Sequence, residues 1–156
     1  MRNNLVPEKI GIFVWRAQRN RLPVRVELEK KGIDLDSIRC PICNEDLESI
    51  EHVLLKCSYA VDVWKRLFKW WGLTFPNGAS LCDLLQDGNR FPNSSIQSKI
   101  WQASVWVCAN KIWQNRNYKI FRKSSWMASL LIQEVQVKSF EWIANRLKKM
   151  TLSWLQ

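Results

Sequence analysis

Residues 40–57 read CPICNEDLESIEHVLLKC and contain four side chains of the kinds that bind metal ions, Cys40, Cys43, His52 and Cys57. Three thiolates and one imidazole complete the tetrahedral shell of a zinc ion and leave no position for water, which is typical of structural rather than catalytic zinc sites. The gaps between the ligands match none of the usual iron–sulfur patterns. The spacing C-x2-C-x8-H-x4-C therefore predicts a loop that a structural Zn2+ holds together.

The spacing within the two ligand pairs constrains the local structure. Cys40 to Cys43 is a tight turn, in which Pro41 fixes φ. His52 and Cys57 are five residues apart, which on a continuous α-helix is about 500° of rotation and leaves them about 140° from a common face. A helix over 48–56 must therefore end or bend before Cys57.

Two alternatives to this ligand set stay open in the sequence. If the helix does not break, Cys82 or Cys108 replaces Cys57 as the fourth ligand; otherwise we expect both to be buried thiols. The Cys pair can also lie near the only His by chance, without a metal. The preference for metal ligation over disulfides rests on an intracellular location for the five Cys residues.

The rest of the chain has helical periodicity and no strong alternating strand pattern. Helices are expected at 7–20, 23–31, 48–56, 59–71, 81–86, 95–121 and 126–155. Ser58 is the expected N-cap of the helix at 59–71, and Ser94 or Ser95 that of the long helix after it. The predicted fold class is all-α, mostly helical, with a small CCHC zinc-stapled loop and a long C-terminal helical hairpin.

A stretch rich in turn-forming residues divides the chain. Pro76, Gly78, Gly88 and Pro92 lie within 73–93, which we expect to be a connector. It separates a zinc-binding domain at 5–72 from a helical hairpin tail at 94–156.

The composition of the 156 residues disfavours an enzyme and a membrane protein. One His and 14 acidic residues leave few groups for acid–base catalysis. The longest apolar-rich stretch, 100–108, is well below the roughly 20 residues of a membrane span. No secretory signal is visible at 1–15. We expect a non-catalytic protein that is intracellular, nuclear or cytoplasmic, and not secreted.

Several short motifs, taken together, resemble a known family. They are VPEKIGIFVWR (6–16), NRLPVR (20–25), CPIC (40–43), EH (51–52), CSYA (57–60) and VW (63–64). The combination resembles the reverse transcriptase zinc-binding domain, which lies at the C-terminal end of plant LINE-type (non-LTR) retrotransposon polyproteins. The resemblance covers about 5–72, and 94–142, with IWQNRNYKIF at 112–121, is similar to the helical segment that commonly follows.

The resemblance carries implications for the site and for the role of the chain. It implies that Cys40, Cys43, His52 and Cys57 bind zinc, and that the domain grips element RNA or target DNA during reverse transcription. A Tyr-x-Asp-Asp polymerase motif is absent from the sequence. The segment 94–156 has too few carboxylates for the ribonuclease H activity of some relatives. The chain thus resembles a detached, non-catalytic tail of a larger enzyme.

The net charge of +10 favours a polyanionic partner, but it is unevenly distributed. Residues 94–156 carry ten basic and two acidic side chains, whereas 40–60 carry one and four, so the zinc loop is expected to repel phosphate. Basic residues interleaved with aromatic ones can neutralise phosphates and stack unpaired bases. The candidate nucleic-acid contacts are Arg16, Arg19, Arg21 and Arg25, and Arg116, Lys119 and Arg122 beside Trp113, Tyr118 and Phe121. The alternative is that the charges form solvated helix faces and the aromatics a core.

The sequence supports three hypotheses for the function. The first is a non-catalytic zinc-binding module from a retrotransposon-type polyprotein that binds RNA or DNA with weak sequence selectivity. The second is a Trp-rich helical module for protein interaction or self-association, with Trp113 as a candidate anchor. The third is a degenerate fragment without a selected role. The helix from Ile100 to Trp113 is apolar on nearly all faces and is therefore expected to be packed against other elements on two sides. We expect the second cover to be the remainder of a polyprotein or another copy of the chain.

Overall fold

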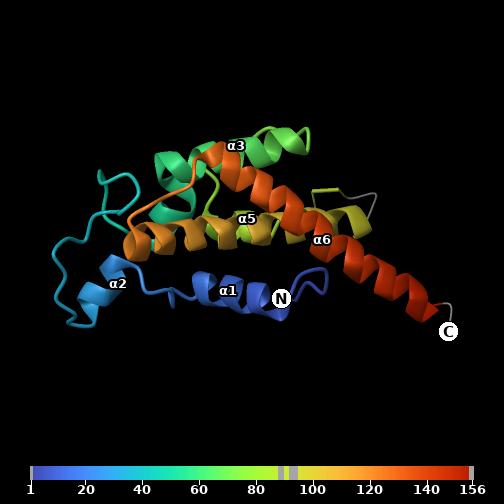
Figure 1. Cartoon of the computed structure of the whole chain (residues 1–156), viewed down its shortest axis with the longest axis horizontal. Coiled ribbons are helices and arrows are strands. Elements are labelled where there is room, and N and C mark those ends of the chain that lie inside the picture. The colour runs from blue at the N-terminus through green and yellow to red at the C-terminus, as the bar shows by residue number, and fades with distance from the viewer. Residues whose placement is uncertain (1, 88–89, 92–94, 155–156) are drawn as a thin grey trace.

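The computed structural model describes residues 2–87, 90–91 and 95–154, whose regular structure is helical (Figure 1). The elements are α1 (Glu8–Gln18), α2 (Arg25–Lys30), the π-helical turn η1 (His52–Lys56), α3 (Ser58–Trp70), α4 (Leu81–Leu85), α5 (Ser95–Arg122) and α6 (Ala128–Trp154). These residues form no β-strand, only one antiparallel bridge between Arg39 and Leu47. The predicted mostly helical fold with a C-terminal hairpin is confirmed. None of the described helices is long and apolar enough to cross a membrane.

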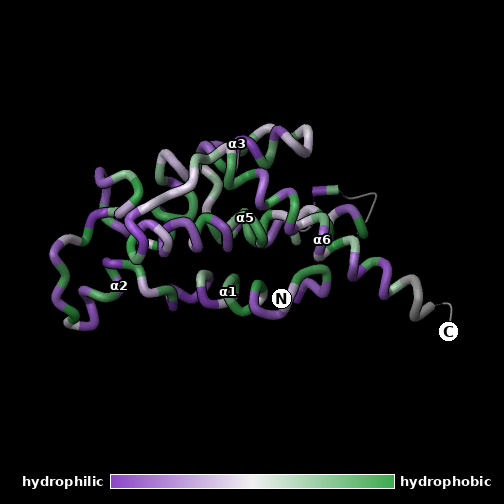
Figure 2. The backbone as a smooth tube through the Cα atoms, in the orientation of Figure 1, coloured by the Kyte–Doolittle hydropathy of each residue, from purple (hydrophilic) through white to green (hydrophobic). Residues whose placement is uncertain are grey.

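Helix α5 lies at the centre of the fold. α1 packs along one side of it, and α3 and α6 pack on the other side (Figure 1). Trp101, Trp106 and Trp113 of α5 are buried, and the indole N–H of Trp106 donates to the carbonyl of Leu85 at 2.8 Å. Figure 2 shows hydrophobic residues concentrated along the middle of α5. Both covers of this helix therefore come from the chain itself, which corrects the expectation of a missing polyprotein or a second copy there.

The turn of the α5–α6 hairpin is held by two side chains. Asn115 Oδ1 accepts a hydrogen bond from the backbone N–H of Trp126 at 2.8 Å. The hydroxyl of Tyr59, on α3, donates to the carbonyl of Trp126 at 2.7 Å. Burial raises the pKa of Tyr59 well above its ordinary value. With Trp126 held in this turn, α6 begins at Ala128, later than the sequence predicts.

Two helix starts differ in detail from the prediction. Cys57, and not Ser58, occupies the N-cap position of α3, because the chain is extended at Cys57 with φ −56° and ψ 138°. α5 begins at Ser95, while Ser94 lies outside the described residues. Gly72 follows the end of α3, with φ 71° in the left-handed region that favours glycine.

The parts on either side of the predicted connector share one core. Leu81, Leu84 and Leu85 of α4 are buried against the same cluster as α1, α3 and α5. Within the predicted connector, Gly88 and Pro92 lie outside the described residues. The division into 5–72, 73–93 and 94–156 stays a prediction.

Candidate metal centre and basic groove

A short hairpin-like turn over 40–46 carries the sulfur atoms of Cys40 and Cys43. The backbone N–H of Cys40 donates to the carbonyl of Asp46 at 2.7 Å, and that of Asn44 donates to the carbonyl of Cys40 at 2.8 Å. Asn44 has φ 58°, a left-handed conformation that Asn tolerates better than most residues. The N–H of Glu45 points at Cys43 Sγ at 3.5 Å. The turn therefore places the sulfurs of Cys40 and Cys43 on one side.

A π-helical turn joins the other two ligand-type residues. The backbone N–H of Cys57 donates to the carbonyl of His52 at 2.7 Å, an i to i+5 bond that widens the last turn. Cys57 then leaves the helix in an extended conformation. The predicted break before Cys57 is confirmed, and the π-turn is the form that it takes.

The four side chains converge on one point. The Sγ atoms of Cys40, Cys43 and Cys57 and a ring nitrogen of His52 all lie within 4.8 Å of one another. Cys43 Sγ is 3.3 Å from His52 Nε2. A tetrahedral zinc ion with ordinary Zn–S and Zn–N bonds sets this separation at about 3.6 Å. The donor set and its spacing therefore fit a zinc ion bound through His52 Nε2.

The surroundings of the cluster favour a thiolate. A hydrogen bond from Cys40 lowers the pKa of Cys57, and the first amides of α3 lower it further. The same hydrogen bond and burial raise the pKa of Cys40. Asp46 Oδ2 lies 3.9 Å from His52 Nδ1, on the far side of the ring from the sulfurs.

The other two cysteines lie apart from this cluster. Cys108 is buried within α5, as expected of a core thiol, and burial raises its pKa. Cys82 is exposed on α4, so the expectation that it is buried is wrong. Neither belongs to the group of ligand atoms among the described residues, and Cys57 fills the fourth position.

The four side chains form a Cys3His cluster whose geometry fits a structural zinc ion, and comparison with protein families agrees with it. Residues 1–64 match the family model described as zinc-binding in reverse transcriptase, and this span includes all four ligand-type residues. The match supports a reverse transcriptase zinc-binding domain in this part of the chain. No match was found among curated proteins or solved structures.

One buried ion pair links the zinc loop to α5. The guanidinium of Arg116 donates to both carboxylate oxygens of Glu48, at 2.6 and 2.7 Å, and both side chains are buried. Glu48 Oε1 also accepts from the backbone N–H of Arg25 at 2.8 Å, at the start of α2. Arg116 is therefore buried in an ion pair with Glu48, and its role as a nucleic-acid contact stays a prediction.

The same contacts change the expected charge of the zinc loop. Glu48 is neutralised by Arg116, and Glu51 Oε1 accepts from the backbone N–H of Leu81 at 3.0 Å. Of its four acidic residues, Glu45 and Asp46 are exposed. The loop is thus less repulsive toward phosphate than its composition indicates.

The N-terminal arginines form two groups. Arg16 and Arg25 donate to backbone carbonyls, those of Arg21 at 3.0 Å and Arg39 at 2.8 Å. The guanidiniums of Arg19 and Arg21 lie 4.6 and 5.2 Å from the ring centroid of Trp15. Among the described residues, no carboxylate pairs with any of the predicted contacts Arg16, Arg19, Arg21 and Arg25.

A groove of about 540 Å³ brings the two predicted basic segments together. Its lining includes Arg16 of α1 and Arg25 of α2, together with Trp113 and Phe121 of α5. Phe121 is 79% exposed, whereas Trp113 is buried. The residues lining this groove are Arg16, Pro23, Arg25, Leu28, Leu35, Trp113, Arg116, Asn117, Ile120 and Phe121.

The remaining predicted contacts lie outside the groove lining. Lys119 is half-buried on α5, and the exposed Arg122 lies 5.6 Å from the Tyr118 ring. Trp15 was missed as a site residue, although its spacing of four from Arg19 on a helix is a readable signal. Its exposure and its two guanidinium neighbours place it beside the basic face of α1.

Proposed function

We propose that the chain is a non-catalytic, zinc-stapled module that binds single-stranded RNA or DNA with little sequence preference. The observation that carries the proposal is the groove between α1–α2 and the end of α5. It combines two guanidiniums without acidic partners in the described chain and an exposed aromatic ring. Such a combination suits a phosphate backbone with an unpaired base.

The groove favours a single strand over a duplex. Bases are available for stacking only where they are unpaired, and Phe121 offers a nearly uncovered ring face. The guanidinium groups of Arg16 and Arg25 donate hydrogen bonds to backbone carbonyls and do not pair with carboxylates in the described part of the chain. Their positive charge is therefore available to a phosphate. The volume of the groove is in the range of ordinary ligand sites.

Zinc has a structural role in this proposal. Cys40, Cys43, His52 and Cys57 hold the ion, which crosslinks the turn at 40–43 to the start of α3. A closed shell of four protein ligands leaves no coordination position for catalysis. Glu48 lies between the ligand pairs, so the ordered loop also positions Arg116, which lines the groove.

The proposal is tested by fluorescence anisotropy with labelled single-stranded and duplex oligonucleotides. Phe121→Ala removes one stacking ring, and we expect a single strand to bind about 5- to 150-fold more weakly. Phe140→Ala is the matched control, because Phe140 is 75% exposed on α6 and lies outside the groove. Equal binding by both variants and the unmodified protein contradicts the groove, and no binding by any of them contradicts the function.

The origin of the chain is part of the same proposal. The matched family supports derivation from a reverse transcriptase polyprotein. The motifs at 6–16 and 20–25 resemble those of the plant LINE type, which we propose as the origin. Reading the genomic DNA upstream of the coding sequence tests this. We expect an open reading frame for a reverse transcriptase there. Upstream DNA without such a reading frame contradicts this origin.

A second candidate function rests on the outer face of α6. Leu130, Val137 and Phe140 are exposed at helical spacing, which suits self-association or a protein partner. Trp113 is buried and cannot be the anchor. Light scattering of the purified chain tests the self-association: a dimer that Val137→Ser and Phe140→Ser abolish supports it, and a monomer at high concentration contradicts it.

A further inference from the structure

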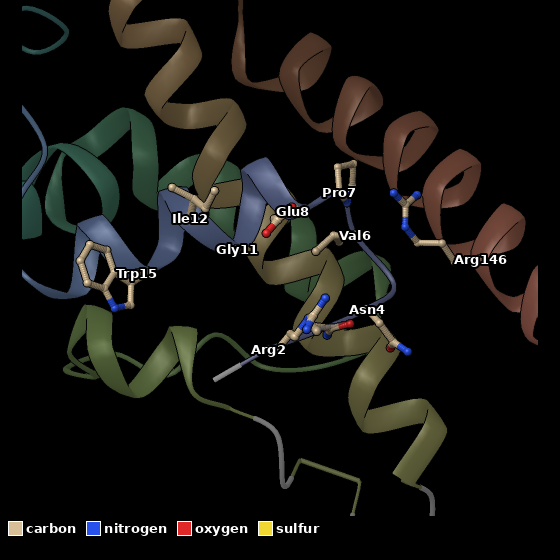
Figure 3. Close-up of a pocket in the computed structure, with 10 residues that line it drawn as sticks. Arg2, Asn4, Val6, Pro7, Glu8, Gly11, Ile12, Trp15 and Arg146 are labelled. Atoms are coloured by element: carbon tan, nitrogen blue, oxygen red, sulfur yellow. The ribbon is translucent and has the colours of Figure 1, made fainter.

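A second cavity, of about 490 Å³, lies between the N-terminal segment, α1 and α6 (Figure 3). Its lining includes two arginines from opposite ends of the chain, Arg2 and Arg146. In Figure 3, Arg146 extends from α6 toward Pro7, and Arg2 extends from the N-terminal segment toward Val6 and Gly11. Neither arginine forms an ion pair within the described part of the chain.

The N-terminal segment is held in place beneath this cavity. The buried amide of Asn3 donates to the carbonyl of Lys99 at 3.0 Å and to Gln102 Oε1 at 3.2 Å. Its carbonyl oxygen accepts from the backbone N–H of Leu5 at 3.0 Å. Arg2 is therefore adjacent to a residue that two hydrogen bonds fix on α5, which reduces the entropy that a ligand has to remove.

The cavity continues along α1 toward Arg19, one of the predicted nucleic-acid contacts. It shares Gly11 and Trp15 with a neighbouring hollow of about 500 Å³ that Gln18 and Arg19 line. From Gly11 to Arg19 the rise along the helix axis is about 12 Å. Trp15, near the middle of this path, is partly exposed and has a guanidinium within 5 Å of its ring centroid.

We propose that the cavity is a second phosphate-binding site, which takes a backbone phosphodiester of the same single strand. Arg2 and Arg146 hold the phosphate from two sides by charge-assisted hydrogen bonds. An unpaired base next to it stacks on Trp15, and the strand continues toward Arg19. This inference rests on the proposed function and extends the bound strand along α1, outside the groove at Phe121.

Glu8 is the acidic residue in the lining, and it bears on the choice of ligand. A single carboxylate beside two guanidiniums leaves a net positive site, so a phosphodiester with one negative charge per phosphate is matched in charge. The indole at Trp15 adds a flat apolar face, which a free inorganic phosphate does not use. The ligand class is therefore a nucleic-acid strand, with phosphate and base bound together.

The test compares salt dependence in two double variants of the full chain. Arg2→Gln/Arg146→Gln removes two charges from the cavity, and Lys65→Gln/Lys69→Gln removes two exposed charges from α3. Anisotropy with a labelled single-stranded oligonucleotide gives the slope of log affinity against log salt. We expect the first variant to reduce this slope by about 0.7, since it loses one phosphate contact and each such contact on a single strand contributes about 0.7.

The controls separate this inference from the proposed function. Arg2→Lys/Arg146→Lys keeps the charge and is expected to restore most of the slope, and thermal melting verifies that each variant is folded. If the chain binds a strand but the two Gln variants have the same affinity and slope, the second site is wrong while the proposed function stands. If the unmodified chain binds no strand, both are wrong.

Discussion

The buried pair of Glu48 and Arg116 gives the sharpest prediction for the fold. Arg116→Met removes a guanidinium that donates to both carboxylate oxygens and leaves Glu48 charged in an interior site. Breaking a buried pair in this way costs about 3 to 5 kcal/mol of unfolding free energy. For a chain of this size, 1 kcal/mol corresponds to about 2 to 4 °C in Tm, so we expect a loss of about 6 to 20 °C.

A double-mutant cycle assigns the loss to the pair itself. Glu48→Gln removes the negative charge but keeps an oxygen that can accept from the N–H of Arg25. We expect Glu48→Gln/Arg116→Met to be more stable than the sum of the two single losses predicts, by about 2 kcal/mol or more, since no buried charge is left alone. Urea unfolding followed by far-UV circular dichroism in saturating Zn2+ measures each free energy.

The matched control is an exposed pair with similar chemistry. Arg66 Nε lies 3.0 Å from Asp62 Oδ1 on α3, and both side chains are about half exposed. Arg66→Met is expected to cost less than about 1 kcal/mol. If Arg116→Met costs no more than Arg66→Met, or if the two single losses simply add, then Arg116 does not join α5 to the zinc loop as described.

Three further predictions concern the ligand cluster, the hairpin turn and the buried thiol of α5. Cys40→Ser is expected to lower the Tm of the zinc-loaded protein by about 10 °C or more and to abolish metal binding. The exposed Cys82→Ser is the control and is expected to change neither, so equal melting curves for the two variants contradict the ligand set. Tyr59→Phe removes the hydrogen bond to the Trp126 carbonyl and is expected to cost about 1 kcal/mol in urea unfolding; an unchanged midpoint contradicts the clamp on the hairpin turn. Burial raises the pKa of Cys108 above its unfolded value near 9, so its contribution to stability is complete below pH 9 and is lost as the pH rises further. Tm measured from pH 8 to 10 is expected to fall more steeply for the unmodified chain than for Cys108→Ala, and parallel curves contradict this.

Local spacing predicted the metal centre well, because its constraints lie within 18 residues. The five-residue gap between His52 and Cys57 required a break in the helix, and the break is there. Its form, a π-turn with Cys57 as the N-cap of α3, depends on a backbone hydrogen bond that spacing does not specify. The helices were also predictable, since apolar periodicity and Gly72 mark their faces and ends.

Contacts between distant residues were not predictable from the single sequence. Arg116 and Glu48 are 68 residues apart, and charge counting placed the first on the surface and the second in a repulsive loop. The packing of α1, α3 and α6 against α5 was also not predictable. Periodicity shows that a helix is buried on all sides, but it does not show which elements bury it. The cavity of Arg2 and Arg146 joins the two ends of the chain and has no local signal.

The central claim, that zinc builds a surface for single-stranded nucleic acid, is tested most directly by titrating metal-free protein with Zn2+ while its affinity for a labelled strand is measured. The predicted result is an affinity that rises with added Zn2+ and levels off at one ion per chain. An affinity that is the same without metal contradicts the structural role of zinc, and no binding at saturating Zn2+ contradicts the proposed function.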